Sequence, residues 1–347
     1  MPDPAGGRIH RDEHGNPSGV LDEGAMMSII WPYQASSSPK EERIRAIVAA
    51  VKEYNAAGYT GVVEMAMDEE AWDAINTLRD TQPDLPIHVA AYWLIKPTAD
   101  HQANSRQVRR AIELSRVYNT TTSPDFRIVE YLEPVVKEAN DGGIQVALHA
   151  IGDAAVRMAI DAIEKHTTPG RRHRIEHLEL VSPEDAARLG RLGLTASIQP
   201  VHSDPAVLTE WPRLIGEDRC HRAFAYREFA DSGALMAIGS DSPTSPWAPM
   251  ENLYVAAMRR SARDPKFTGT FNEHFRLGLC ESVTAATWGA ASSVFDEKRT
   301  GSLAAGKCAD FIVVDMKWDE KSLLQAQVEE TWFGGRKIWD IRDSASA

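Results

Sequence analysis

Histidine and aspartate side chains stand at the ends of apolar segments in the central part of this sequence. The four that could do chemistry are His149, His177, His202 and Asp241. Neutral imidazole nitrogens and carboxylate oxygens are ligands for Zn²⁺ and similar divalent ions. We therefore interpret His149, His177 and Asp241 as a candidate open metal site, and His202 as a candidate substrate contact.

Taken singly, each of these residues has a simpler interpretation. A lone histidine at a strand end is more often structural. An aspartate that follows a Gly-Ser pair, as Asp241 does, more often caps a helix or forms a turn. His202 alone is as easily a loop residue as a substrate contact. Polar groups at the ends of consecutive parallel strands, however, are typical of an active site and not of a core.

The elements that must position these residues alternate between strands and amphipathic helices. Six segments have the composition of strands: Thr60–Met65, Ile87–Ile95, Ile144–Ile151, Arg174–Leu180, Thr195–Val201 and Ala234–Asp241. The helices Asp153–His166 and Ser182–Leu192 each begin with a favoured N-cap residue type, Asp153 or Ser182. The alternation predicts a parallel sheet, either open and doubly wound or part of a (β/α)8 barrel. No glycine-rich phosphate motif follows the first strand, which disfavours a dinucleotide-binding fold.

The two ends of the chain have other patterns. Turn-forming residues predict a hairpin over Gly7–Leu21, and a Pro/Ser-rich stretch predicts a linker over Trp31–Pro39. Apolar residues at helical spacing then predict a helix from Glu41 to Ala57. Near the other end we predict a helix over Asn272–Ala291, followed by a small all-β appendage.

Composition limits which classes of protein this chain can belong to. The 347 residues carry a net charge of −12, which argues against nucleic acid or an anionic membrane as a partner. Cys220, Cys280 and Cys308 are far apart and predict no disulfide framework or cysteine-rich zinc site, so we expect buried thiols in a reducing compartment. We find no secretory signal, and no apolar run approaches the ~20 residues of a membrane span. We expect a cytoplasmic protein, with a homodimer left open.

Several motifs occur in the order found in one known family. They are His149–Asp153, Arg174–His177, Gln199-Pro200 with His202, Gly239–Asp241 with Pro243, and the glycine-rich Gly301–Asp315. In this order they resemble the successive signatures of amidohydrolase family 3, over most of the chain. Each motif is weak alone, and the ordered set is specific.

The resemblance implies a distorted (β/α)8 barrel with a composite β-sandwich, and one or two divalent metal ions, with Zn²⁺ expected. His149 and His177 would be metal ligands, and Asp241 would both bind metal and act as the base that takes a proton from water. The reaction would be hydrolysis of a carbon–nitrogen bond in a small amide, such as an N-acyl or N-formyl amide. The implied domains are residues 1–57 (hairpin, linker and helix), 58–295 (barrel) and 296–347 (β-sandwich segment, with β strands at Gly301–Asp315 and Thr331–Trp339).

The sequence also departs from the family pattern. The family's first barrel strand carries a His-x-His pair, and this chain has none. The family's fourth strand is represented at most by a stub at Phe126–Val129, so six strands stand where eight are expected. We therefore expect an incomplete barrel, truncated at the N-terminus and missing an internal segment. Glu64 could stand in as a fourth ligand, although a polar residue at a barrel mouth explains it more simply.

Two hypotheses of different class follow. The first is a metal-dependent hydrolase of carbon–nitrogen bonds. The second is a catalytically inactive remnant, or an incomplete gene model, of such an enzyme. If Asp241 must serve as both ligand and base, we expect the chain as written to have little amidase activity.

Overall fold

The computed structural model describes residues 2–4, 7–96, 98, 100–118, 121–124 and 129–344. By its internal contacts the chain forms two compact units. The smaller unit comprises Met1–Lys52 and Asp68–Leu85, and the larger comprises Glu53–Met67 and Pro86–Ala347. No helix in the described part of the chain is both long and apolar enough to cross a membrane.

The smaller unit confirms the hairpin and corrects the linker. Strands β1 (Ile9–Arg11) and β2 (Pro17–Leu21) pair antiparallel around the predicted turn. The stretch predicted as a linker instead contains helix α2 (Trp31–Ser37), because its proline lies in the first helical turn, where no backbone N–H is needed. The other helices that begin in this unit are α1 (Glu23–Ala25), the π-helix η1 (Met26–Ile30), α3 (Lys40–Ala56) and α4 (Glu69–Thr81).

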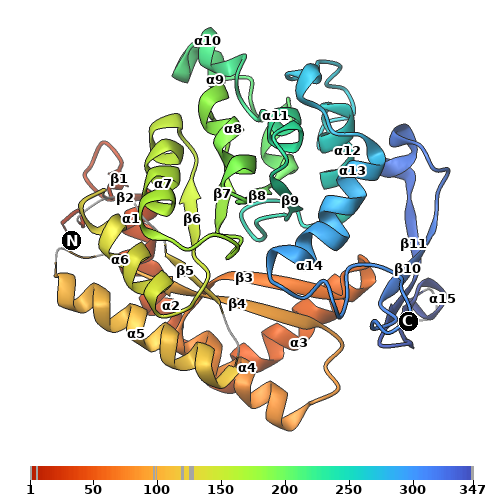
Figure 1. Cartoon of the computed structure of the whole chain (residues 1–347), viewed down its shortest axis with the longest axis horizontal. Coiled ribbons are helices and arrows are strands. Elements are labelled where there is room, and N and C mark those ends of the chain that lie inside the picture. Colours follow the sequence, from red (N-terminus) through yellow and green to blue (C-terminus); the bar gives the residue numbers. More distant parts are fainter. Residues whose placement is uncertain are drawn as a thin grey trace. The chain divides into compact units, whose positions relative to one another are not determined.

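The larger unit contains two parallel ladders of strands. The first has the order β3 (Gly61–Met67), β4 (His88–Ile95) and β5 (Thr121–Pro124). The second has the order β6 (Ala147–Ala150), β7 (Arg174–His177), β8 (Thr195–Ile198) and β9 (Leu235–Ile238). Each strand of the second ladder pairs with the next in the chain, so all four carboxyl ends lie at one edge (Figure 1).

The six predicted strands are present, but the count of six is wrong. The described residues form seven parallel strands, because β5 (Thr121–Pro124) adds a parallel neighbour to β4. Its Thr-Thr-Ser-Pro sequence has no apolar alternation, and backbone pairing alone makes it a strand. Of the predicted stub, residues 126–128 lie outside the described residues, and Val129 begins helix α6 (Val129–Asp141). Strand β7 is also shorter than predicted and ends at His177.

Helices follow the strands of the larger unit, as the alternation predicted. They are α5 (His101–Tyr118), α7 (Asp153–His166), α8 (Pro183–Arg191), α9 (Trp211–Ile215), α10 (Glu217–Cys220), α11 (Tyr226–Asp231), α12 (Pro249–Met258), α13 (Leu279–Thr284) and α14 (Ala290–Ser293). The described residues of this unit also form three short 3-10 helices, η2 (Pro200–Ser203), η3 (Glu273–Phe275) and η5 (Glu320–Gln325), and the π-helix η4 (Ala285–Gly289). The predicted cap Ser182 is confirmed, since its side chain accepts from the Asp185 amide, whereas the cap of α7 is Gly152. The helix predicted from Asn272 begins only at Leu279.

Burial of the residues of β7, β8 and α7 stabilises the second ladder. All residues of β7 and β8 are buried, and on α7 Val156, Ile160 and Ile163 are buried at helical spacing. Parallel strands normally require helices on their faces, because crossovers return over the sheet. The predicted buried thiols are only partly correct: Cys220 is buried, but Cys280 is exposed and Cys308 is partly exposed.

The C-terminal segment forms a separate antiparallel sheet. Its order is β10 (Phe311–Asp315), β11 (Gln327–Phe333) and β12 (Arg336–Asp340), and a short helix α15 (Ile341–Ser344) follows. Phe311 pairs with Trp332, and Thr331 pairs with Trp339. The predicted pairing of the two glycine-flanked segments is therefore confirmed, although the strand begins only at Phe311.

Candidate metal centre

A left-handed backbone turn brings His177 to the face that carries His149. In the ladder His149 pairs with Glu176, and paired residues project to the same face of a sheet. Strict alternation would send His177 to the opposite face. Instead His177 has a φ of 77°, and its ring centroid lies 4.3 Å from that of His149. The end of β7 is thus shaped to place two imidazoles together.

Left-handed backbone at residues other than glycine occurs after two of the strands that carry the candidate site. Leu178 continues the turn after His177 with a φ of 55°, and Asp241 after β9 has a φ of 57°. Each such residue costs on the order of 1 kcal/mol and persists only where the surrounding structure holds it. Strained backbone of this kind concentrates at functional sites.

His177 is a buried imidazole with an unsatisfied nitrogen. The residue is 7% exposed, and its Nδ1 has no hydrogen-bond partner among the described residues. Burial, together with the neighbouring ring of His149, lowers the pKa of His177 to about 4. His177 is therefore neutral near neutral pH, which is the form that binds a metal ion. Buried polar atoms nearly always have a partner, so this nitrogen suits a bound ion.

His202 and Glu179 extend the cluster. His202 comes from the turn η2 after β8, and its ring stacks on that of His177 at 5.5 Å with a 9° angle between planes. Its Nδ1 lies 3.2 Å from Oε1 of Glu179, a carboxylate that is 7% exposed. One donor atom from each of His177, Glu179 and His202 lies within 4.8 Å of the others.

Sequence reasoning missed Glu179. The available signal was a single acid among Leu178, Leu180 and Val181, where an unpaired carboxylate would be costly to bury. The predicted strand ran on to Leu180, so Glu179 was treated as part of a strand. Because the strand ends at His177, Glu179 instead lies in the turn beside the imidazoles.

Asp241 completes a row of contacts. Its Oδ2 lies 3.5 Å from Nε2 of His202 and accepts a hydrogen bond from Thr244 Oγ1 at 2.7 Å. If His202 Nδ1–H donates to Glu179, a neutral ring offers only a lone pair to Asp241. A hydrogen bond between His202 Nε2 and Asp241 Oδ2 would then require a further proton on one of the two groups. The Asp241 side chain is 39% exposed, so water and substrate can reach it.

The structure thus brings together all four residues singled out by sequence, through successive contacts from His149 to His177, His202 and Asp241. Glu64 has a different setting. It is exposed on β3, and its carboxylate accepts a hydrogen bond from the Ala66 amide at 2.9 Å. In the described part of the chain it belongs to no group of closely spaced metal-binding atoms.

Asn252 ties together the two loops that carry His202 and Asp241. Buried on α12, its side chain accepts from the Val201 amide at 2.9 Å and donates to the Gly239 carbonyl at 2.6 Å. Val201 precedes His202 directly, and Gly239 stands two residues before Asp241. Asn252 therefore fixes the spacing between the ends of β8 and β9.

We expect Asn252→Ala to lower the free energy of unfolding by about 1–3 kcal/mol, because it leaves a buried donor and a buried acceptor unpaired. Urea denaturation measures the change. Gln327→Ala, which removes an exposed amide on β11, is the control and should stay within about 0.5 kcal/mol of the parent. Equal losses in the two variants would show that Asn252 is not a structural tie.

A buried ionic network lies on the same strands. Arg174 Nε donates to Glu176 Oε1 at 2.8 Å, Nη1 to Ser293 Oγ at 2.6 Å and Nη2 to Ser197 Oγ at 2.8 Å. The guanidinium also lies 5.2 Å from the ring centroid of Tyr92. Arg174 and Glu176 are 4% and 6% exposed. The network fixes Glu176, the strand neighbour of His149, and so supports the floor of the site.

Comparison with known proteins shows a consistent likeness. A sequence profile of the amidohydrolase family matches residues 1–338. The chain is 27% identical to Protein LONG AFTER FAR-RED 3 of Arabidopsis thaliana, over 97% of this chain and 64% of that protein. It is 22% identical to an N-substituted formamide deformylase of Arthrobacter pascens, over 90% of this chain and 63% of that protein. The chain thus spans less than two thirds of the length of either relative.

Solved structures show the same fold. An uncharacterized metal-dependent hydrolase from Pyrococcus horikoshii OT3 aligns with a TM-score of 0.68 at 19% identity, covering 86% of this chain and 64% of that one. Atrazine chlorohydrolase TrzN from Arthrobacter aurescens TC1, solved with zinc, aligns with a TM-score of 0.65 at 16% identity, covering 93% of this chain and 80% of that one.

Proposed function

This chain belongs to the amidohydrolase family, and from that premise we propose that it is a metal-dependent hydrolase of carbon–nitrogen bonds in small non-peptide amides. The observation that carries the proposal is the unsatisfied Nδ1 of buried His177 beside the ring of His149. A buried neutral imidazole with a free nitrogen and a second imidazole in contact is a donor set for a divalent ion.

We propose that the two parallel ladders belong to one (β/α)8-type barrel, which the sequence predicts to be incomplete, and that β10, β11 and β12 are a segment of a β-sandwich. The support is the parallel order within both ladders and the likeness to metal-dependent hydrolases of this fold. In such a barrel the carboxyl ends of the strands carry the active site. His149, His177, His202 and Asp241 all lie at or just after such ends.

The residues that would hold the metal are His149, His177 and Asp241, and Glu179 is available as a further carboxylate ligand. Nitrogen and carboxylate oxygen donors of this kind suit Zn²⁺. A bound ion would supply Lewis acidity toward the substrate carbonyl and toward water. With Glu179 in place of Asp241 in the donor set, Asp241 would be available as the base.

The proton chemistry belongs to Asp241 and His202. Asp241, partly exposed, would accept a proton from the attacking water and later deliver it to the leaving nitrogen. Thr244 Oγ1 donates a hydrogen bond to Asp241 Oδ2 at 2.7 Å, and His202 Nε2 lies 3.5 Å from the same oxygen. The 3.2 Å contact of His202 Nδ1 with Glu179 Oε1 orients the ring, so that Nε2 faces Asp241. We assign His202 a second role as a substrate contact.

The amide class of substrate is supported by the relative that carries the name N-substituted formamide deformylase. N-acyl and N-formyl amides are therefore the first substrates to test. The alternative is a catalytically inactive remnant of such an enzyme, which the absence of a His-x-His pair favours. The two proposals differ in one measurement, zinc-dependent hydrolysis of an amide panel by this chain.

We expect His177→Ala to weaken Zn²⁺ binding at this centre by more than about 100-fold, because the loss even of an outer partner costs about 10- to 100-fold. Equilibrium dialysis of chelator-stripped protein, with metal analysis, measures the affinity. His221→Ala, which removes an exposed histidine after α10, is the matched control. Unchanged affinity in His177→Ala would contradict the proposed metal centre.

A further inference from the structure

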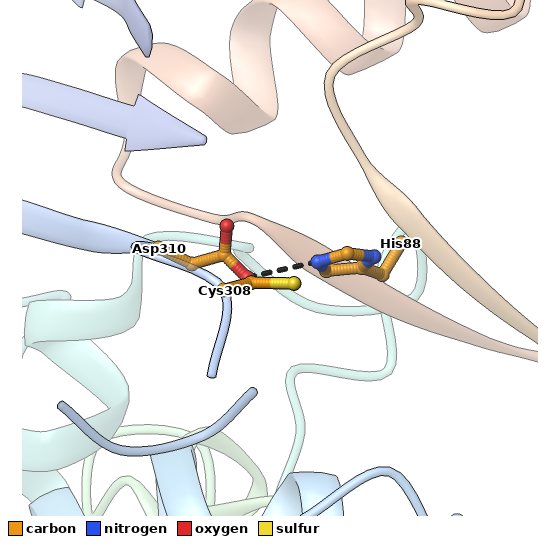
Figure 2. Close-up of side chains that lie close together, drawn as sticks. All are labelled: His88, Cys308 and Asp310. Atoms are coloured by element: carbon orange, nitrogen blue, oxygen red, sulfur yellow. Dashed lines mark hydrogen bonds and ion pairs between the residues drawn. The ribbon is translucent and has the colours of Figure 1, made fainter. Parts of the chain in front are cut away.

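His88, Cys308 and Asp310 form a second group of metal-binding side chains, independent of the proposed active site. His88 begins β4, and Cys308 and Asp310 precede β10. One donor atom from each lies within 4.8 Å of the other two. Figure 2 shows the three side chains pointing toward a common point, with the sulfur of Cys308 turned toward the imidazole.

We propose that His88, Cys308 and Asp310 bind a divalent metal ion of intermediate softness, such as Zn²⁺. Thiolate, imidazole and carboxylate are three ligands that zinc accepts together, with a fourth position left for water. The site differs in kind from the cluster around His177, because it contains a sulfur ligand. It joins residues more than two hundred positions apart in the chain.

The existing contacts already hold two of the three ligands. Asp310 Oδ1 accepts from the Gly334 amide and Oδ2 from Thr300 Oγ1, both at 2.8 Å, so the carboxylate is fixed. His88 Nε2 lies 2.8 Å from Asp310 Oδ2, and the side chain of Asp310 is only 2% exposed. A ligand fixed by neighbouring hydrogen bonds is the arrangement that metal sites use.

Binding requires a defined movement of protons. Arg299 Nη2 lies 3.1 Å from His88 Nδ1, so a neutral His88 accepts at Nδ1 and carries its proton on Nε2. On metal binding the Nε2 proton and the Cys308 thiol proton leave to solvent, and Nδ1 takes up a proton. Arg299 must then turn away, and its side chain is 62% exposed, which permits this.

Cobalt substitution tests the site directly, because Co²⁺ bound to a thiolate gives a sulfur-to-metal charge-transfer band in the near ultraviolet. We expect the chelator-stripped chain to gain this band on Co²⁺ titration. The band should disappear in Cys308→Ser and persist in Cys220→Ser, Cys280→Ser and the His149→Ala/His177→Ala double variant. Absence of the band in the parent, or its survival in Cys308→Ser, would overturn the proposal.

Two further measurements test the metal site if the Cys308→Ser variant does not fold. With free Zn²⁺ at ten times its dissociation constant, alkylation of Cys308 in the parent chain should slow about tenfold by mass action. Mass spectrometry of the Cys308 peptide measures this rate, and the exposed Cys280 should be unaffected. Arg299→Gln should tighten Co²⁺ binding about fivefold, because it removes a nearby positive charge. Alkylation of Cys308 at an unchanged rate would overturn the proposal.

Discussion

Replacing Asp241 with asparagine should lower the rate of zinc-dependent amide hydrolysis by about 10²- to 10⁴-fold, the range that a positioned general base contributes. Asparagine keeps the shape and a carbonyl oxygen for Thr244, but it cannot take a proton. The left-handed backbone at this position tolerates asparagine as well as aspartate. The fold should therefore be retained, and the loss should be in turnover per bound metal ion.

The measurement is hydrolysis of a panel of N-acyl and N-formyl amides by zinc-loaded protein, with metal content determined on the same samples. Asp231→Asn on α11, where the side chain is 64% exposed, is the matched control and should keep parental activity. Turnover that survives in Asp241→Asn would remove Asp241 from the mechanism. A parent chain that binds zinc but hydrolyses nothing would favour the inactive remnant.

One rule of topology was enough to predict that the candidate residues lie near one another. Because carboxyl ends of successive parallel strands meet at one edge, the sequence predicts that His149, His177 and Asp241 converge, with His202 as a candidate substrate contact. The contacts from His149 through His202 to Asp241 agree with this expectation. The roles of these residues as ligands and base stay predictions, since geometry alone does not establish them.

What the sequence could not predict depends on local backbone conformation. Consecutive positive φ values at His177 and Leu178 end β7 early and direct the chain so that Glu179 lies in the cluster. The residue types alone do not predict such a turn. Similarly, β5 has no apolar periodicity and becomes a strand only by pairing with β4. The stretch from Trp31 is helical because proline is tolerated in a first turn, which composition alone does not distinguish from a linker.

The Arg174–Glu176 pair shows how one motif can serve stability as well as the site. The motif was recognised because it ends in His177, and the structure shows that its first and third residues form a buried ion pair. Burial alone would lower the pKa of Arg174, but the Glu176 carboxylate and Tyr92 outweigh it and raise that pKa. The guanidinium is therefore charged at all ordinary pH values and depends on Glu176 for compensation.

Glu176→Ala should accordingly lower the free energy of unfolding by about 3–5 kcal/mol, because it leaves the Arg174 charge buried and unpaired. That loss is a large fraction of the about 5–15 kcal/mol by which native proteins are stable. Urea denaturation followed by circular dichroism measures it. Glu210→Ala removes a partner from the exposed Arg213–Glu210 pair and is the matched control, with an expected change below about 1 kcal/mol.

A double variant separates the charge from the space that the side chains fill. Arg174→Met with Glu176→Leu removes both charges and keeps much of the volume, so we expect it to be more stable than Glu176→Ala and close to the parent. It should nevertheless weaken Zn²⁺ binding at the proposed centre, because Glu176 pairs in register with His149 and the network holds that strand end. If Glu176→Ala is no more destabilising than Glu210→Ala, then the buried pair does not support the fold in the way argued. If the double variant is as unstable as Glu176→Ala, then lost packing, and not unpaired charge, accounts for the loss.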